Sequence, residues 1–194
     1  MDYALEIEGA PQTVPAGTSI LLEHPSIGGS DPIDTGFLSA GSEPALVVST
    51  RTTAREVAEK LDHYGVDPRQ IHILDAVSID RGYSRRDKPR VEFVPSPDDV
   101  DGIVKEVQLF FERDDGGSRL SFDSVSELAY YAGESAAVDG LDRLTELLRQ
   151  HGAIGLFHVS PEVHDSAIQE EFEAACDGLI SLDESGSISA DFDF

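Results

Sequence analysis

The segment that follows residues 19–22 carries the residue types of a phosphate-binding loop. The apolar run leads into EHPSIGGSDPIDTGFL, a Gly/Ser-rich turn followed by a potential helix. Backbone N–H groups of such a turn and of a helix N-terminus attract an anion, so a phosphate could bind there. Against the pattern G-x-x-x-x-G-K-S/T, Gly28 matches the second glycine and Ser30 the hydroxyl. Glu23 replaces the first glycine, and Gly29 replaces the lysine.

The missing lysine weighs against a working nucleotide site. That lysine would supply the charge that contacts the terminal phosphates. Glu23 and Asp31 instead place negative charge near the position of a phosphate. Residue chemistry alone therefore favours an ordinary structural turn, and a nucleotide site that includes Gly28, Gly29 and Ser30 stays open as the alternative.

A second segment, residues 75–97, concentrates positive charge. It holds five of the fourteen basic residues, namely Arg81, Arg85, Arg86, Lys88 and Arg90. Because it is longer than an ordinary connection, we interpret it as a functional or mobile loop insertion. Its cations could accept an acidic protein, a nucleotide phosphate of a neighbouring protomer or a nucleic acid, and Tyr83 offers a ring for stacking. A loop that only neutralises the protein's own acidic surface is the simpler alternative.

The charge balance disfavours some classes of partner. The 194 residues include 38 Asp and Glu against 14 Lys and Arg, which gives a formal net charge of −24. Such a chain repels polyanions, so nucleic acids and anionic membrane surfaces are disfavoured. Salt near 1 M screens charge within about 3 Å, and we interpret the acidic composition as halophilic adaptation.

One cysteine and the N-terminal sequence indicate the compartment. Cys176 has no second cysteine with which to form an intrachain disulfide. The first residues lack the basic region and the apolar core of a signal peptide, and nowhere do 18 apolar residues run together. We therefore expect a soluble cytoplasmic protein without membrane contact.

Short apolar runs alternate with segments of helical period. Strands are predicted at Ser19–Leu22, Ala45–Ser49, Gln70–Leu74, Arg119–Phe122, Ile154–Val159 and Leu179–Leu182. Continuous apolar runs suit strands that are covered on both faces, so the sheet should be mostly parallel. Helices are predicted at Thr53–Tyr64, Pro97–Glu112 and Val138–His151. The alternation predicts one α/β domain over residues 1–194, with residues 184–194 as an acidic tail or an edge strand.

In this order the elements resemble those of KaiC/RecA-like ATPase domains. The N-terminal half of that family is similar to PAGTSILLEHPSIGGSD followed by GFLSAGSEPALVVSTRTTAREVAEKLDHYGVDPRQIHILD. The segment around the family's Mg-associated Asp is similar to RLSFDSVSELAYYA, with Asp123 at that position. The family's late strand, terminal helix and last strand are similar to GAIGLFHVSPEVHDSAIQEEFEAACDGLISLD. The resemblance covers most of residues 15–183.

The resemblance implies a three-layer RecA-like fold, in which a mostly parallel sheet lies between two layers of helices. It also implies that the strand at 119–122 lies beside the first strand rather than at an edge of the sheet. The nearest kind of relative is an uncharacterised KaiC-like protein of haloarchaea.

The sequence departs from this family where hydrolysis would take place. The family has adjacent acidic residues after its second strand, whereas VVSTRTTAREV offers Arg51 and Thr52, neither of which can act as a general base. Because the loop lysine is absent too, we expect no catalytic residues and no NTP hydrolysis. The expected function is that of a catalytically degenerate domain, a regulatory or protein-interaction module. The alternative is a nucleotide sensor that binds ATP with weak or no hydrolysis.

A vestigial ATP and Mg²⁺ site would use Gly28, Gly29, Ser30 and Asp123. Mg²⁺ seldom has an all-protein shell, so Ser30 and Asp123 could hold it only together with phosphate oxygens. We therefore expect no resident cofactor and no metal site. His158 and His164 could suggest metal ligands, but no neighbouring cysteine completes the set, and ordinary strand and surface histidines are favoured.

The sequence also disfavours a serine hydrolase. The serines near predicted carboxyl ends of strands lie outside a G-x-S-x-G elbow: Ser26, Ser30, Ser49 and Ser160. The remaining expectation is contact with a protein partner or with a second copy of the chain. Its surface would include Arg81, Tyr83, Arg85, Arg86, Lys88 and Arg90.

Overall fold

The computed structural model describes residues 2–83, 88–113 and 117–192. These residues include an eight-stranded sheet in the order β10-β9-β3-β8-β7-β4-β5-β6. Its strands are β3 (Ser19–Glu23), β4 (Ala45–Ser49), β5 (Ile71–Asp75), β6 (Val91–Phe93), β7 (Arg119–Asp123), β8 (Ile154–Val159), β9 (Gly178–Leu182) and β10 (Ile188–Phe192). Neighbouring strands are parallel, except that β10 pairs antiparallel with β9 at one edge. The predicted fold class is confirmed.

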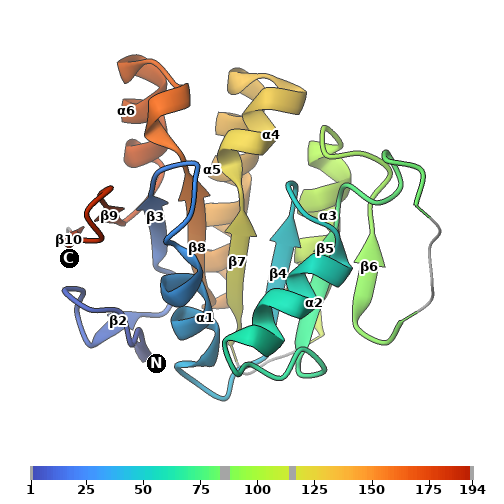
Figure 1. Ribbon diagram of the computed structural model, residues 1–194, viewed down its shortest axis with the longest axis horizontal. Coiled ribbons are helices and arrows are strands. Elements are labelled where there is room, and N and C mark those ends of the chain that lie inside the picture. Colours follow the sequence, from blue (N-terminus) through green and yellow to red (C-terminus); the bar gives the residue numbers. More distant parts are fainter. Residues whose placement is uncertain (1, 84–87, 114–116, 193–194) are drawn as a thin grey trace.

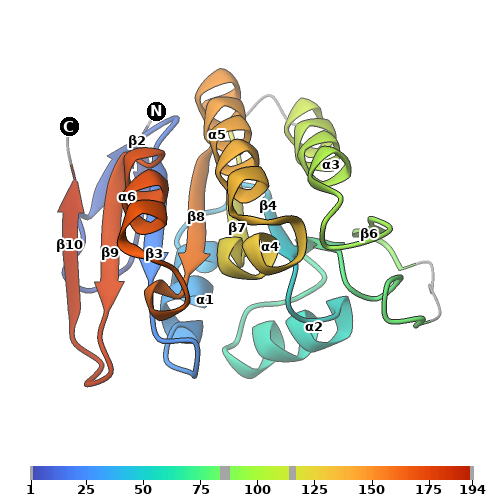
Figure 2. The ribbon, with the colours of Figure 1, turned by 90° about the horizontal axis from the view of Figure 1, so that it is seen from above.

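Helices cover both faces of this sheet (Figure 1, Figure 2). One face carries α1 (Asp31–Ser39) and α2 (Ala54–His63), and a hairpin of β1 (Asp2–Ala4) and β2 (Thr13–Pro15) packs into the same layer. The other face carries α3 (Val100–Glu112), α4 (Val125–Ala132), α5 (Glu134–His151) and α6 (Ser166–Ala174). No helix in the described ranges is both long and apolar enough to cross a bilayer.

Two apolar clusters, one on each face of the sheet, form the core. Leu21, Phe122 and Phe157 belong to the cluster under α3 to α6. Ile20 and Leu22 belong to the cluster under α1 and α2. Successive strand residues point to opposite faces, so a strand between two helical layers is apolar at every position. This explains the continuous apolar runs in the sequence.

The position of β7 differs from the expectation. β8 lies between β3 and β7, and β7 pairs with β8 and β4. The prediction that this strand lies beside the first strand is therefore wrong, although β7 is interior and not at an edge. A continuous apolar run specifies burial on both faces, whereas the identity of the neighbouring strands depends on helix crossovers that a local pattern does not encode.

The parallel strands end together at one edge of the sheet, which we call the carboxyl edge. In Figure 1 their arrowheads point to the end of the molecule where α4 and α6 lie. The loop of residues 24–30 after β3, the turn of residues 50–53 after β4, and residues 124 and 160 after β7 and β8 therefore meet at this edge. Sites of open α/β sheets assemble at such an edge.

Candidate functional site

Lys60 joins three carboxylates at the carboxyl edge. Its Nζ lies 2.8 Å from Asp34 Oδ2, 3.7 Å from Asp31 Oδ1 and 3.9 Å from Asp123 Oδ2. Asp31 and Asp34 belong to α1, and Asp123 ends β7. Lys60 extends from α2 to these carboxylates. The Lys60 side chain is 16% exposed and that of Asp34 is fully buried. The ammonium group thus ties three elements together away from bulk water.

Both ions of the closest pair remain charged at neutral pH. Burial alone would raise the pKa of Asp34, but the charge of Lys60 and the hydrogen bonds from His158 and Lys60 hold it well below its usual range. Burial alone would lower the pKa of Lys60, but Asp34 and Asp123 raise it above its usual value. Each group therefore stabilises the charged form of the other.

A chain of two histidines continues from Asp34. His158 Nε2 lies 3.3 Å from Asp34 Oδ1, and His158 Nδ1 lies 3.2 Å from His24 Nε2. His24 Nδ1 lies 2.9 Å from the carbonyl oxygen of Pro25. Three N–H donors are needed to make all three bonds, and two neutral imidazoles have only two. Burial and the neighbouring His158 lower the pKa of His24, which favours its neutral form.

Asp123 lies between two cations. Its Oδ1 is 3.6 Å from Arg51 Nε, and its Oδ2 is 3.9 Å from Lys60 Nζ. The main chain around Asp123 is fixed by Thr50, whose N–H donates to the Asp123 carbonyl at 2.9 Å and whose hydroxyl donates to the Ser124 carbonyl at 2.9 Å. Within the part of the chain that the structure describes, Oδ1 is buried and accepts no hydrogen bond. This oxygen is therefore shielded from bulk water, with the Arg51 guanidinium as its charged neighbour.

The residues of the predicted phosphate loop form the turn that leads into α1. Gly28 and Gly29 have φ of +78° and +94°, a region that favours glycine. Ser30 is buried at the N-cap of α1, where its carbonyl accepts from the N–H groups of Ile33 and Asp34, while its hydroxyl makes no cap bond. The structure therefore places Ser30 and Asp123 at the same edge, linked through α1 and Lys60.

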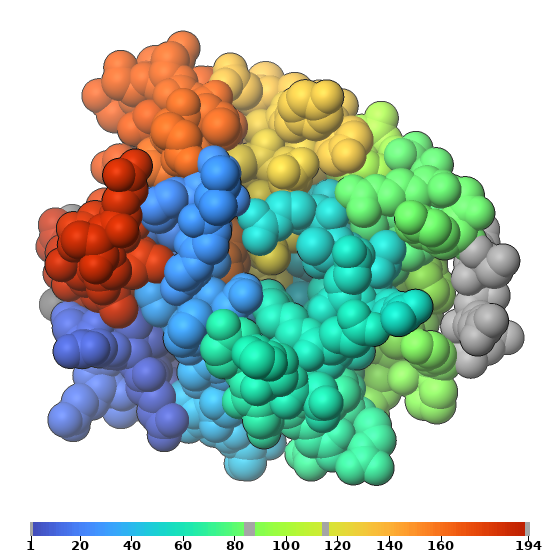
Figure 3. Space-filling model, in the orientation of Figure 1, coloured from blue at the N-terminus to red at the C-terminus, as the bar shows by residue number. Residues whose placement is uncertain are grey.

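Acidic side chains line the groove beside this loop. The groove has a volume of about 660 Å³ and is lined by the segment of residues 25–33 and by the turn between β9 and β10. In Figure 3 these two segments, blue and red, lie side by side. Its charged lining residues are Glu162, Asp183 and Glu184. Ser26 donates its N–H to Glu162 Oε1 at 2.7 Å and its hydroxyl to the same oxygen, so this carboxylate lies against the loop. A polyphosphate at Gly28 and Gly29 would face three carboxylates and no balancing cation of this groove.

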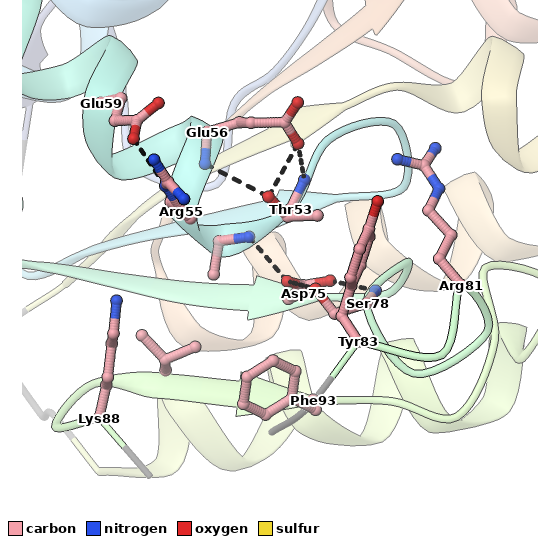
Figure 4. A pocket seen from close by; sticks show the side chains of 12 residues that line it. Thr53, Arg55, Glu56, Glu59, Asp75, Ser78, Arg81, Tyr83, Lys88 and Phe93 are labelled. Atoms are coloured by element: carbon pink, nitrogen blue, oxygen red, sulfur yellow. Dashed lines mark hydrogen bonds and ion pairs between the residues drawn. The ribbon is translucent and has the colours of Figure 1, made fainter. Parts of the chain in front are cut away.

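The basic segment borders a separate groove of about 610 Å³ (Figure 4). Arg81 and Lys88 lie toward opposite sides of it, with Tyr83 and Phe93 between them in this view. Tyr83 is 59% exposed. Arg85 and Arg86 lie outside the described residues. Arg90 does not line the groove; its guanidinium donates to the carbonyl of Gln70 at 3.3 Å.

The groove is less basic than the sequence of the segment indicates. Glu56 and Glu59 of α2 line it together with Arg55, which pairs with Glu59 at 2.8 Å. Arg81 Nη2 donates to the carbonyl of Arg51 at 3.0 Å, so this side chain connects the segment to the carboxyl edge. Of the predicted surface residues, Arg81, Tyr83 and Lys88 therefore line a groove that carries charges of both signs, while Arg90 lies outside it.

Comparison with known proteins adds the family and the fold. The model described as "Family of unknown function (DUF7090)" matches residues 1–192. The chain belongs to this family. No curated protein matches it in sequence.

Two solved structures from Pyrococcus horikoshii OT3 have a similar fold. The KaiC-like protein PH0186 has a TM-score of 0.70 and 20% identity, over 94% of this chain and 81% of that one. A second protein, described as a structural study of Project ID PH0250, has a TM-score of 0.66 and 14% identity, over 91% and 87% of the two chains. At these identities the likeness shows that this DUF7090 protein has a KaiC/RecA-like fold.

Sequence reasoning missed several polar residues of the DUF7090 protein. Asp34 and Lys60 carry no local motif, because Asp34 is an acidic residue in the first turn of a short helix and Lys60 is a single lysine beside an apolar helix face. His158 was weighed as a metal ligand with His164, but its ring contacts are with His24 and Asp34. Asp75, whose carboxylate accepts hydrogen bonds from the N–H groups of Ala54, Val77 and Ser78, ends an apolar run as Asp123 does. Asp123 itself was identified through the family resemblance.

Proposed function

We propose that this protein is a catalytically degenerate KaiC/RecA-like domain, a pseudo-ATPase that acts as a regulatory or protein-interaction module. The observation that carries the proposal is the pairing of Asp123 with Lys60 and Arg51. The resemblance to KaiC/RecA-like ATPase domains places Asp123 at the position of that family's Mg-associated carboxylate. Here its charge is neutralised by two side chains of the protein itself.

The residues present do not fit Mg²⁺ and ATP well. A metal ion at Asp123 would have to displace or approach the ammonium of Lys60, which is also bonded to the fully buried Asp34. Arg51 and Thr52 follow β4, and neither is a general base at neutral pH. The groove at Gly28 and Gly29 has an acidic lining. Phosphoryl transfer depends on positioning and on cationic stabilisation of the phosphates, so each of these features opposes it.

The proposed interaction surface is the basic segment with Tyr83. Charge alone is a weak basis for affinity in high salt, because screening shortens its range. A partner would therefore need an apolar anchor, and the exposed ring of Tyr83 can provide one. The acidic remainder of a second copy, or another acidic protein, would supply the opposing surface. Because its net charge is −24, we infer a halophilic cytoplasmic protein of haloarchaeal kind.

Nucleotide binding and turnover test the proposal directly. We expect neither ATP hydrolysis nor tight Mg-dependent ATP binding in molar KCl, measured by phosphate release and by calorimetric titration with ATP, ADP and Mg²⁺. An ATPase activity that Asp123→Ala abolishes would overturn the proposal. Tight binding without turnover would instead establish a nucleotide sensor.

The interaction surface has its own test. Arg85→Ser with Arg86→Ser should weaken self-association or partner capture in molar KCl, as measured by sedimentation and pull-down. Arg143→Ser with Arg149→Ser removes the same charge from α5 on the other face of the sheet and should leave association unchanged. If both folded double variants associate as strongly as the native protein, the basic segment is not the interface. A surface loop that neutralises the protein's own acidic charge is then the better account.

A further inference from the structure

Ser126, His164 and Glu134 form a hydrogen-bonded chain that is separate from the ion pairs of Asp123 with Lys60 and Arg51. Ser126 Oγ lies 2.9 Å from His164 Nε2, and His164 Nδ1 lies 3.3 Å from Glu134 Oε1. The three side chains come from α4, from the residue after the 3₁₀ turn η1 (Pro161–Val163), and from the start of α5. Such an order of hydroxyl, imidazole and carboxylate is the arrangement that activates a serine for nucleophilic attack.

One set of proton positions satisfies the whole chain. His164 Nδ1–H donates to the Glu134 carboxylate, which leaves Nε2 as the acceptor for the Ser126 hydroxyl. The N–H of Ser160 donates to Ser126 Oγ at 2.9 Å, so the hydroxyl proton is directed to His164. A second lone pair of Oγ stays free for attack.

The imidazole is held in place by its own supports. The side chain of His164 is 3% exposed, and its ring meets that of Phe172 edge to face at 5.2 Å. Gln169 Nε2 donates to the carbonyl oxygens of His164 and Pro161 at 2.9 and 2.7 Å. Ring and main chain are therefore fixed independently, as a general base requires.

The chain opens into a cavity. Ser126, His164 and Glu134 all line a space of about 440 Å³ at the carboxyl edge, a size that suits a small organic molecule. Ala129, Tyr130 and Val163 give this space an apolar side, and the 80% exposed Tyr130 stands at its margin. The lining thus fits a small ester with an apolar acyl or aryl group.

Ser126 also lies where developing negative charge can be stabilised. It is the second residue of α4, after the N-cap Ser124, whose hydroxyl accepts from the N–H of Glu127. The N–H groups of Val125 and Ser126 have no intrahelical acceptor, since they belong to the first turn. First-turn N–H groups beside a nucleophile are suited to an oxyanion.

We propose that Ser126, His164 and Glu134 hydrolyse small carboxylic esters in this cavity. Ser126 Oγ attacks the ester carbonyl while His164 Nε2 takes the hydroxyl proton, and the proton then passes to the departing alkoxide as the bond from carbonyl carbon to alkoxide oxygen breaks. Water attacks the resulting acyl-serine, gives one proton to His164, and releases the carboxylic acid as Ser126 regains its hydrogen. Glu134 is a positioning residue that fixes the tautomer of His164. The activity is independent of the proposed loss of ATP hydrolysis, because Ser126, His164 and Glu134 take no part in the ion pairs of Asp123. Arg51, which pairs with Asp123, also lines this cavity.

The test combines covalent labelling with ester turnover in molar KCl. A fluorophosphonate should add to the native protein at Ser126, located by mass spectrometry of peptides, and p-nitrophenyl butyrate should be hydrolysed. Ser126→Ala and His164→Asn should each lower kcat by at least about 100-fold. Glu134→Gln should lower kcat with little change in KM.

Ser39→Ala is the matched control. It removes an exposed hydroxyl of α1, on the other face of the sheet and outside this cavity, so the rate should be unchanged. Labelling of the unmodified protein keeps the proposal testable even where a variant does not fold. No adduct at Ser126, an adduct at another serine, or an unchanged rate in folded Ser126→Ala would overturn it and leave a purely structural link between η1 and α4.

Discussion

Replacing Lys60 by Met should destabilise the fold, because it removes the cation of a buried ion pair and leaves its anion behind. Breaking such a pair from one side costs about 3–5 kcal/mol. Asp34 has no exposed side-chain surface, but it keeps hydrogen bonds from Ser121 and His158, so we expect the lower end of this range, about 3 kcal/mol. Met preserves the length and the apolar stem of Lys, so packing changes little.

Urea unfolding in molar KCl measures this loss. With an m-value of about 3 kcal/mol/M, the midpoint should fall by about 1 M. High salt should not mask the effect, because screening acts mainly on exposed charges. Lys105→Met removes an exposed lysine of α3 and should change stability by less than about 0.5 kcal/mol.

A double variant separates the ion pair from packing. Lys60→Met with Asp34→Asn leaves no uncompensated charge in the pair and should be more stable than Lys60→Met alone. If Lys60→Met is no less stable than Lys105→Met, the ammonium does not hold the carboxylate cluster and the reasoning is refuted.

Three further predictions concern single residues. Thr53→Ala removes the capping box of α2, in which Thr53 and Glu56 exchange hydrogen bonds, and should cost about 1 kcal/mol in calorimetry; no change in melting temperature would contradict it. Asp75→Ala leaves the N–H groups of Ala54, Val77 and Ser78 without their acceptor and should speed amide exchange at these positions, a result that unchanged exchange would exclude. Burial raises the pKa of the Cys176 thiol to about 12 from an ordinary value of 9.0, so the folded state binds the proton more tightly and its stability should fall as pH rises from 9.0 toward 12. That alkaline loss should be smaller in Cys176→Ala, and an identical pH profile for both proteins would rule the thiol out.

The sequence was sufficient to predict six strands of the sheet, though not the neighbour of β7, because burial on both faces leaves a local signal. All six predicted apolar runs are strands, and residue 123 was recognisable as a carboxylate at the end of one of them. The short strand β6 and the hairpin of β1 and β2 left no comparable signal, since each strand has three residues and only partial burial. Short elements of this kind form through tertiary contacts rather than through their own pattern.

The polar contacts of the site could not be predicted from the sequence. Asp34 and Lys60 lie 26 positions apart, and His24 and His158 lie 134 apart, so their meeting depends on strand order. Arg119 is a similar case. It begins an apolar run, yet it is fully buried, with its guanidinium bonded to Glu43 and to the carbonyls of Ala4 and Phe37. A single sequence marks such residues as charged but does not reveal the acceptors that permit burial.

The charge balance of the carboxyl edge links fold and proposed function. Asp31, Asp34 and Asp123 contribute three negative charges, while Lys60 and Arg51 contribute two positive ones. A site built for Mg²⁺ and polyphosphate balances its carboxylates with the bound ion, which must be free to leave. Here both cations are covalently part of the chain, on α2 and on the turn after β4, so they stay beside the carboxylates. Restoring the loop lysine at Gly29 would add charge near the phosphate position, but it would not remove Lys60 from among the carboxylates or supply a base beside Arg51.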